Sequence, residues 1–127
     1  MAGRKPLKDP RHRLGAAGEE LAEKELRRQG YRILERNFTS PLGEVDLIAR
    51  HRGTLVFVEV KTRKQSRYGA PQEAVSPAKQ ARLRRLADYY LRAKGLKDQA
   101  VRFDVVAITF QDDAPRIEII VNAIVDV

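Results

Sequence analysis

The sequence contains no cysteine, which excludes a disulfide framework, a thiolate metal site and a cysteine nucleophile. This absence suits the reducing cytoplasm, where we expect the protein to be located. The sequence also lacks an apolar run near the ~18 residues of a membrane span, and no apolar signal segment opens it. We therefore expect a protein that has no membrane partner.

Positive charge is what the sequence has in excess. Its 127 residues include 25 Lys and Arg against 17 Asp and Glu, which gives a formal net charge of +8 and a pI near 10.1. With 43% hydrophobic residues the chain has the composition of a soluble globular protein. We expect a flexible basic arm over residues 1–9 and a single domain over residues 10–127. The charge favours a polyanionic partner, nucleic acid before a membrane surface.

The spacing of apolar residues predicts two helices and five strands. The helices are expected over residues 10–29 and 77–94, and each is followed by a glycine that ends it. The strands are expected over residues 31–38, 43–51, 55–62, 102–110 and 116–121. Because a helix separates the third strand from the fourth, we expect these two to be parallel, joined by a right-handed crossover. This order predicts an α/β domain with a central mixed sheet.

The second and third strands are predicted to form a hairpin that carries charges where a strand normally avoids them. A turn at residues 52–53 places opposite each other the residues whose numbers sum to 105. Asp46 then faces Glu59, on the same face as Lys61. Two carboxylates ~5 Å apart repel by roughly 3 kcal/mol at an effective dielectric of about 20. Such a pair is tolerated when one carboxylate is protonated or when a cation lies between them, and a divalent ion such as Mg²⁺ or Mn²⁺ fits the second case.

Other residues can complete this site. Lys61, expected opposite Glu44, can orient a water molecule or neutralise developing charge, and the Val60 carbonyl can add an oxygen ligand. Glu19 on the first helix is either an additional acid of the site or a solvated helix charge. Lys79, at the start of the second helix, is either a second cation over the site or an ordinary helix lysine.

Asp46 followed by Glu59-Val60-Lys61 looks like the PD-(D/E)xK signature of the restriction-endonuclease-like nucleases. The whole chain resembles the bacterial YraN family of endonuclease-like proteins, which is related to archaeal Holliday junction resolvases. The matching stretches are residues 15–19, 30–31, 43–48, 57–63, 68–69, 79 and 102–104. In one departure from the signature, Val45 stands where the signature has proline.

This resemblance implies a restriction-endonuclease-like αβββαβ core in which helices flank the central mixed sheet. It also implies that Asp46 and Glu59 are metal ligands, that Lys61 is catalytic and that Glu19 is an accessory acid. A nuclease-like fold hosts several functions, so the resemblance by itself does not establish an activity.

Basic residues after the hairpin and on the second helix are candidates for contact with nucleic acid. The candidates are Arg63, Lys64, Arg67, Tyr68, Lys79, Arg82 and Arg85. The first four lie on a long polar connection, where basic groups beside an aromatic ring suit phosphate contact and base stacking. The last three recur at three-residue steps along one flank of the helix. The alternatives are a solvated loop and a solvated helix face.

These features favour a Mg²⁺- or Mn²⁺-dependent endonuclease that hydrolyses phosphodiester bonds of DNA, with branched DNA among its candidate substrates. We hypothesise a homodimer, because cleavage of a junction needs two matched sites. The alternatives are a non-catalytic nucleic-acid-binding module with a nuclease-like fold and a structural scaffold. We expect His12 and His51 to be surface residues, with His51 in the turn near the site, and Asp104 to form a structural salt bridge with Arg102.

Overall fold

The computed structural model describes residues 10–63, 76–111 and 114–123. The elements in chain order are α1 (Pro10–Arg28), β1 (Arg32–Ser40), β2 (Gly43–His51), β3 (Thr54–Arg63), α2 (Pro77–Ala93), β4 (Val101–Gln111) and β5 (Ala114–Ile120). The predicted elements are all present, with ends that differ by at most two residues from those expected. The basic arm expected over residues 1–9 lies outside the described residues.

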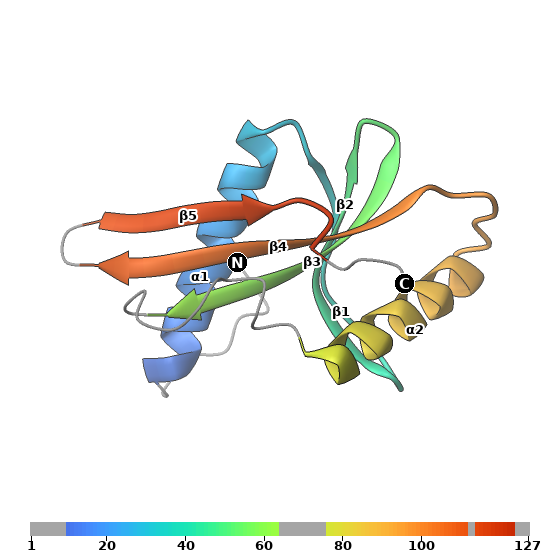
Figure 1. Ribbon diagram of the computed structural model, residues 1–127, viewed down its shortest axis with the longest axis horizontal. Coiled ribbons are helices and arrows are strands. Elements are labelled where there is room, and N and C mark those ends of the chain that lie inside the picture. The colour runs from blue at the N-terminus through green and yellow to red at the C-terminus, as the bar shows by residue number, and fades with distance from the viewer. Residues whose placement is uncertain (1–9, 64–75, 112–113, 124–127) are drawn as a thin grey trace, which may run out of the picture.

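All five strands form one sheet in the order β1-β2-β3-β4-β5 (Figure 1). The pairing of β3 with β4 is parallel and the other three pairings are antiparallel, so the sheet is mixed. This confirms the predicted α/β class with its αβββαβ order, to which β5 adds an edge strand. β3 is the central strand, and its four consecutive residues from Leu55 to Val58 are buried.

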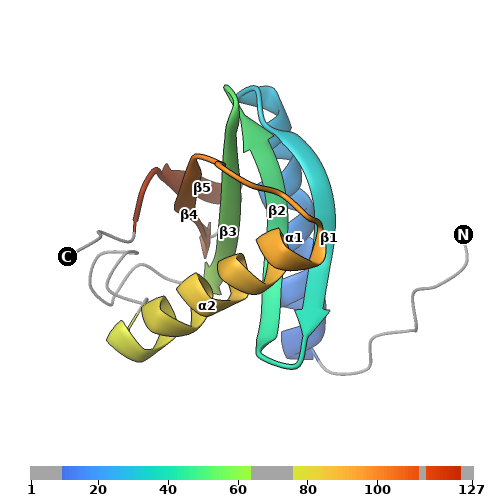
Figure 2. The same cartoon turned by 90° about the vertical axis from the view of Figure 1, so that its right-hand side faces the viewer.

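The two helices cover opposite faces of the sheet (Figure 2). On the α2 face, Leu86 and Tyr90 pack against Ile48 and Phe57. On the α1 face a second apolar cluster gathers helix and strand residues, including Ala22, Leu26, Leu47, Val56 and Val58. Alternate β3 residues therefore serve two different cores, as the period of two along a strand requires. Burial of each large side chain such as Phe57 contributes roughly 2–3 kcal/mol.

Short-range signals fix the ends of the helices. The Ser76 side chain accepts a hydrogen bond from the Lys79 N–H (3.2 Å), and Pro77 occupies the first turn of α2, a combination that favours helix initiation. Gly30, with φ of 93°, follows α1, where the left-handed conformation suits glycine. Neither described helix is long and apolar enough to span a membrane.

Candidate functional site

The candidate site lies where β2 and β3 separate. Their pairing follows the predicted register, with partner numbers summing to 105, from His51 and Thr54 to Leu47 and Val58. Beyond that point β2 continues to pair with β1, whereas β3 continues to pair with β4. Figure 1 shows β3 leaving with β4 and β5 while β1 and β2 run on together. The register therefore ends one step before Asp46.

The predicted direct pairs of Asp46 with Glu59 and of Glu44 with Lys61 are consequently wrong. The register argument assumed that the hairpin stays paired to its end. β2 instead stays with β1, with which it pairs as far as Gly43. β3 stays with β4, with which it pairs as far as Arg63. The acidic residues line a gap in the sheet instead of one of its faces.

The Asp46 side chain is directed into this gap by a local irregularity. Val45 packs in the cluster under α2, whereas Leu47 packs in the cluster under α1. Residues two apart in a regular strand share a face, so the alternation of side chains along β2 is interrupted at Asp46. Asn37, in the neighbouring strand between the partners of these two residues, has φ of 51°. Oδ2 of Asp46 accepts a hydrogen bond from the Val60 N–H at 2.8 Å and so replaces the missing strand partner.

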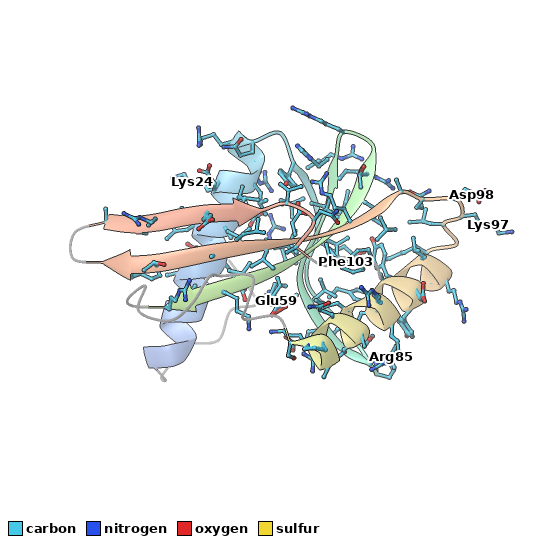
Figure 3. All side chains as sticks on the ribbon, viewed as in Figure 1. Lys24, Glu59, Arg85, Lys97, Asp98 and Phe103 are labelled. Carbon is cyan, nitrogen blue, oxygen red and sulfur yellow. The ribbon has the colours of Figure 1, made fainter. Side chains whose placement is uncertain are left out.

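Glu59 is held between two lysine side chains on the α2 side of the gap. Its Oε2 lies 2.5 Å from Nζ of Lys79 and 3.7 Å from Nζ of Lys61. The side chains of Glu59 and Lys79 are only 12% and 19% exposed, so this ion pair is shielded from solvent. Figure 3 shows Glu59 in the space between β3 and the first turn of α2. Of the two interpretations of Lys79, the structure therefore supports a second cation over the site.

The gap raises the pKa of Asp46 to about 6. Burial is the largest cause, because it disfavours the charged form, and the negative charge of Glu59 adds to it. The hydrogen bond from Val60 and the charge of Lys79 act in the opposite direction without cancelling the effect. Asp46 is thus a carboxyl group that gives up its proton well above the usual range of an aspartate, in part because of the neighbouring Glu59 charge.

The same surroundings shift the pKa values of Lys61 and Lys79 in opposite directions. Burial and the neighbouring Lys79 ammonium lower the pKa of Lys61, although Glu59 and Asp46 partly compensate. Burial alone would lower the pKa of Lys79 as well, but its hydrogen bonds to Glu59 and Lys61 prevail and raise it. The ion pair with Glu59 therefore favours the charged form of Lys79, whereas burial disfavours that of Lys61.

Glu19 approaches the gap from α1. Its negative charge contributes to the raised pKa of Asp46, which places the two carboxylates within electrostatic reach. The preceding residue, Gly18, explains how the helix comes so close: a Cβ there would lie 2.0 Å from Cγ2 of Thr62 on β3. Glycine is thus required for this approach. Glu19 is more than a solvated helix charge, and the accessory-acid interpretation remains a prediction.

The donor set of the gap suits a hard divalent cation. Asp46, Glu59 and Glu19 offer only carboxylate oxygens, and no group of three or more acidic, His or Cys residues in the described part of the chain is arranged to hold a metal ion. A closed protein cage is therefore not formed there. Mg²⁺ is commonly bound through one or two carboxylates while it keeps several waters, and Asp46 with Glu59 fits that pattern. The Val60 N–H bonds to Asp46, and a ligand role for its carbonyl stays a prediction.

The predicted nucleic-acid contacts divide into three groups. Lys64, Arg67 and Tyr68 lie outside the described residues. Arg63 ends β3 and is half-buried, beside the gap. Lys79 belongs to the site itself, and the other two helix residues, Arg82 and Arg85, are exposed on α2.

The prediction that His51 is a surface residue near the site is also wrong, because its side chain is held by other residues. Its ring stacks on Tyr31 with centroids 4.0 Å apart, and its Nδ1 lies 2.9 Å from Nη2 of Arg102. It also ends β2, so it lies at the opposite end of that strand from Gly43 and away from the gap. The prediction that His12 is a surface residue concerns a side chain that is outside the described ones.

Arg102 joins His51 to a buried aspartate. Nε and Nη2 of Arg102 donate to Asp104 at 2.9 and 3.0 Å, which agrees with the predicted structural salt bridge. Tyr31 donates to the same carboxylate at 2.7 Å, and burial together with that hydrogen bond raises the pKa of Tyr31 to about 12. Apart from the Arg102–Asp104 pair, sequence periodicity gave no signal for this network, since its members come from the end of β2, the first half of β4 and the loop before β1.

Comparison with known proteins gives one family. A family model described as "Uncharacterised protein family UPF0102" matches residues 18–108. A UPF0102 protein from Geobacter sulfurreducens is 54% identical over 111 residues, which are 87% of each chain. UPF0102 proteins from Syntrophus aciditrophicus and Moorella thermoacetica are each 47% identical, over 87% and 89% of this chain and 87% and 96% of their own.

Among solved structures, one of Pyrococcus furiosus SfsA in complex with Ca²⁺ is similar to this chain with a TM-score of 0.35 and 16% sequence identity. The similarity covers 95% of this chain and 72% of that one. A TM-score this low does not indicate a shared fold.

Proposed function

The chain belongs to the uncharacterised protein family UPF0102, which confirms the predicted relationship to YraN proteins, and we propose that it is a Mg²⁺- or Mn²⁺-dependent endonuclease. One observation carries this proposal. The desolvated Asp46 carboxyl, with its pKa raised to about 6, lies beside Glu59 in a gap of the central sheet that two lysines also enter. Perturbed acidic groups that converge with cations in this way are typical of catalytic sites.

Each residue has a role that follows from its surroundings. Asp46 and Glu59 would hold the ion through carboxylate oxygens. When bound, such an ion would act as a Lewis acid, which lowers the pKa of a coordinated water and stabilises charge on the phosphoryl group. The water oxygen forms a bond to phosphorus, the bond to the leaving sugar oxygen breaks, and a proton passes to that oxygen. Lys61, whose lowered pKa eases proton exchange, orients the attacking water, and Lys79 neutralises charge on the phosphate.

DNA is the substrate class that the charge distribution supports. The net charge of +8 and the exposed Arg82 and Arg85 next to the gap suit a polyanion, and long-range attraction would raise its local concentration. Branched DNA remains a substrate that only the sequence resemblance suggests. The homodimer hypothesis depends on that substrate, and measurement of the molecular mass with and without a four-way junction tests it.

A non-catalytic nucleic-acid-binding module is the second candidate. The short ion pair between Lys79 and Glu59 favours it, because Lys79 already supplies part of the positive charge that the acidic residues require. In that case Asp46 would be neutral or hydrogen-bonded in a site that binds no ion. The two functions differ in whether a divalent ion is needed for turnover.

The experiment is cleavage of labelled four-way-junction, flap, single-stranded and linear duplex DNA with Mn²⁺ and with Mg²⁺. Asp46→Ala and Lys61→Ala proteins are assayed beside the wild type, with Glu118→Ala, which removes an exposed acid on β5, as the control. We expect metal-dependent cleavage that both site variants lose and the control retains. Tight binding of DNA without cleavage, unchanged in Asp46→Ala, would leave the binding module as the function.

A further inference from the structure

A hollow lies between α2 and the turn that joins β1 to β2. It has a volume of about 570 Å³, within the range of small-ligand pockets. Five of its lining residues come from α2 and one from the turn between β1 and β2. They are Leu42, Arg85, Asp88, Tyr89, Arg92 and Ala93. We refer to this hollow as the α2 pocket.

The α2 pocket offers an aromatic and an aliphatic surface to solvent. Leu42 and Tyr89, with 42% and 38% of their surface exposed, are two of the four exposed large hydrophobic residues among those that the structure describes. The Tyr89 ring packs on one side against the Phe38 ring, with centroids 6.3 Å apart. A fixed and exposed tyrosine ring is a platform on which a planar group can stack.

The positive charges near the α2 pocket belong to arginine side chains that are available to bind an anion. The guanidinium groups of Arg82, Arg85 and Arg92 are exposed and form no ion pair with the carboxylates of the described residues. Together with Lys79 they recur at steps of three, three and seven residues, so at 3.6 residues per turn their directions turn progressively around α2, from Lys79 facing Glu59 to Arg92 at the α2 pocket. The helix rises ~1.5 Å per residue, so this row extends for about 20 Å from Lys79 in the gap to Arg92 at the α2 pocket.

Arg82 brings this row against the tip of the β1–β2 hairpin. Its Cδ lies against Gly43, 3.5 Å from where a Cβ of that glycine would be, at the tip of the β1–β2 hairpin. Leu42, the neighbour of Gly43, lines the α2 pocket. Figure 3 labels Arg85 on the exposed side of α2, while Glu59 lies between that helix and β3. The gap and the α2 pocket are thus two ends of one cationic path along the helix and the hairpin tip.

Asp88 decides which part of a nucleotide the pocket can accept. Its carboxylate lines the pocket and repels a phosphate there, whereas it can accept a hydrogen bond from the exocyclic amino group of a base. The arginines at the rim suit the phosphates on either side. The faces of bases in a duplex are covered by their stacked neighbours, so only an unpaired base can present a face to Tyr89.

We propose that the α2 pocket binds an unpaired base, stacked on Tyr89, of a single-stranded nucleic-acid segment that runs from the catalytic gap along the arginine row. This inference rests on the proposed function and specifies its substrate: nucleic acid with a single-stranded segment beside the bond that is cleaved. Arg85 and Arg92 bind the phosphates that flank the base.

The test measures binding without catalysis. Fluorescence anisotropy of labelled oligo-dC and of a matched blunt duplex is recorded in EDTA with wild type, Tyr89→Ala, Tyr89→Phe and Leu42→Ser proteins. Stacking contributes ~1–3 kcal/mol per base, so Tyr89→Ala is expected to weaken single-strand binding about 5- to 100-fold and duplex binding by less than about 2-fold. Tyr89→Phe retains a ring and should bind like the wild type. Leu42→Ser, which does not alter α2, should weaken single-strand binding alone.

Equal losses for single strand and duplex in Tyr89→Ala, or no loss for either, would overturn the inference. Its failure is distinguishable from failure of the proposed function, because binding in EDTA does not depend on cleavage. If the wild type cleaves DNA with Mn²⁺ but Tyr89→Ala binds as the wild type does, only the α2 pocket inference fails. If no DNA is cleaved but single-strand binding requires the Tyr89 ring, the pocket stands and the nuclease proposal fails.

Discussion

Oδ2 of Asp46 accepts a hydrogen bond from the Val60 N–H at 2.8 Å, across the point where β2 and β3 stop pairing. The carboxylate thereby takes the place of a strand partner and is fixed inside the sheet, next to Glu59 and away from bulk water. This relationship connects the fold with the proposed chemistry, because the divergence of strands that breaks the register also turns the Asp46 carboxylate toward β3, the strand that carries Glu59.

Replacement of Asp46 by asparagine should stabilise the metal-free protein at neutral pH. The raised pKa, about 6 against an ordinary value of 3.8, means that the folded state binds more protons than the unfolded state between these values, so ionisation of Asp46 costs stability as the pH rises. Asn retains the acceptor for Val60 and carries no charge. We expect the free energy of unfolding of Asp46→Asn to exceed that of the wild type by about 1–3 kcal/mol at pH 7.

Urea unfolding in EDTA at pH 7.5, 5.5 and 4 measures this difference. It should shrink as the pH falls and become small at pH 4, where Asp46 is protonated in the folded state and about half protonated in the unfolded state. A variant that is less stable than the wild type at pH 7.5 would show that the Asp46 charge is already compensated.

Removal of the Lys79 charge should have opposite effects on stability and on metal affinity. Lys79→Gln deprives Glu59 of its 2.5 Å ion pair, which should lower the free energy of unfolding by about 1–3 kcal/mol. It also removes the cation that competes with a metal ion for Glu59, so Mn²⁺ should bind more tightly. Lys94→Gln is the matched control on the same helix, because its partner Glu35 is more exposed and the pair contributes less than about 1 kcal/mol. Weaker Mn²⁺ binding by Lys79→Gln would contradict the competition.

The contact between α1 and β3 predicts a pair of substitutions that compensate each other. Gly18→Ala places a Cβ 2.0 Å from Cγ2 of Thr62 and should destabilise the protein by about 1–3 kcal/mol. Thr62→Ser deletes that methyl group, and the next atoms, Cβ of Thr62 and Cδ1 of Ile108, lie at 3.4 and 3.6 Å. The double variant should therefore recover most of the lost stability in thermal unfolding. Additive losses in the double variant would show that the helix does not approach β3 this closely.

His51 should make the protein less stable in mild acid. Burial and the charges of Arg102 and Arg52 lower the pKa of His51 in the folded state, while Asp104 and the Gln29 backbone act in the opposite direction. The unfolded state therefore binds more protons as the pH falls below 6.5, and stability is lost from there down to the folded pKa. His51→Asn keeps an acceptor for Arg102 and cannot titrate. Its stability should fall less than that of the wild type between pH 7.5 and 5.5; parallel losses would exclude His51 as the cause.

The part of the fold that follows from local pattern was predictable from the sequence. The turn after His51 fixed the register of the hairpin as far as Leu47 and Val58, and the helix between β3 and β4 implied their parallel pairing. The candidate acids were predictable as well, because charges inside apolar strands are rare and require compensation.

The remainder depends on contacts between distant segments. The divergence of β2 from β3 is set by β1 and β4, so no hairpin rule could place Asp46 inside a gap. The partner of His51, Arg102, is 51 residues away along the chain. The approach of Gly18 to Thr62 gave no signal in the sequence, since a glycine in a helix has many explanations.

The most direct test is calorimetric titration of Mn²⁺ into the wild type, Asp46→Asn, Glu59→Gln and the control Asp88→Asn. We predict that the wild type and the control bind Mn²⁺ with the same affinity. Both site variants should lose this binding, because each lacks one of the two anionic ligands. Absence of Mn²⁺ binding by the wild type, or equal binding by Asp46→Asn, would contradict a metal-dependent site between β2 and β3.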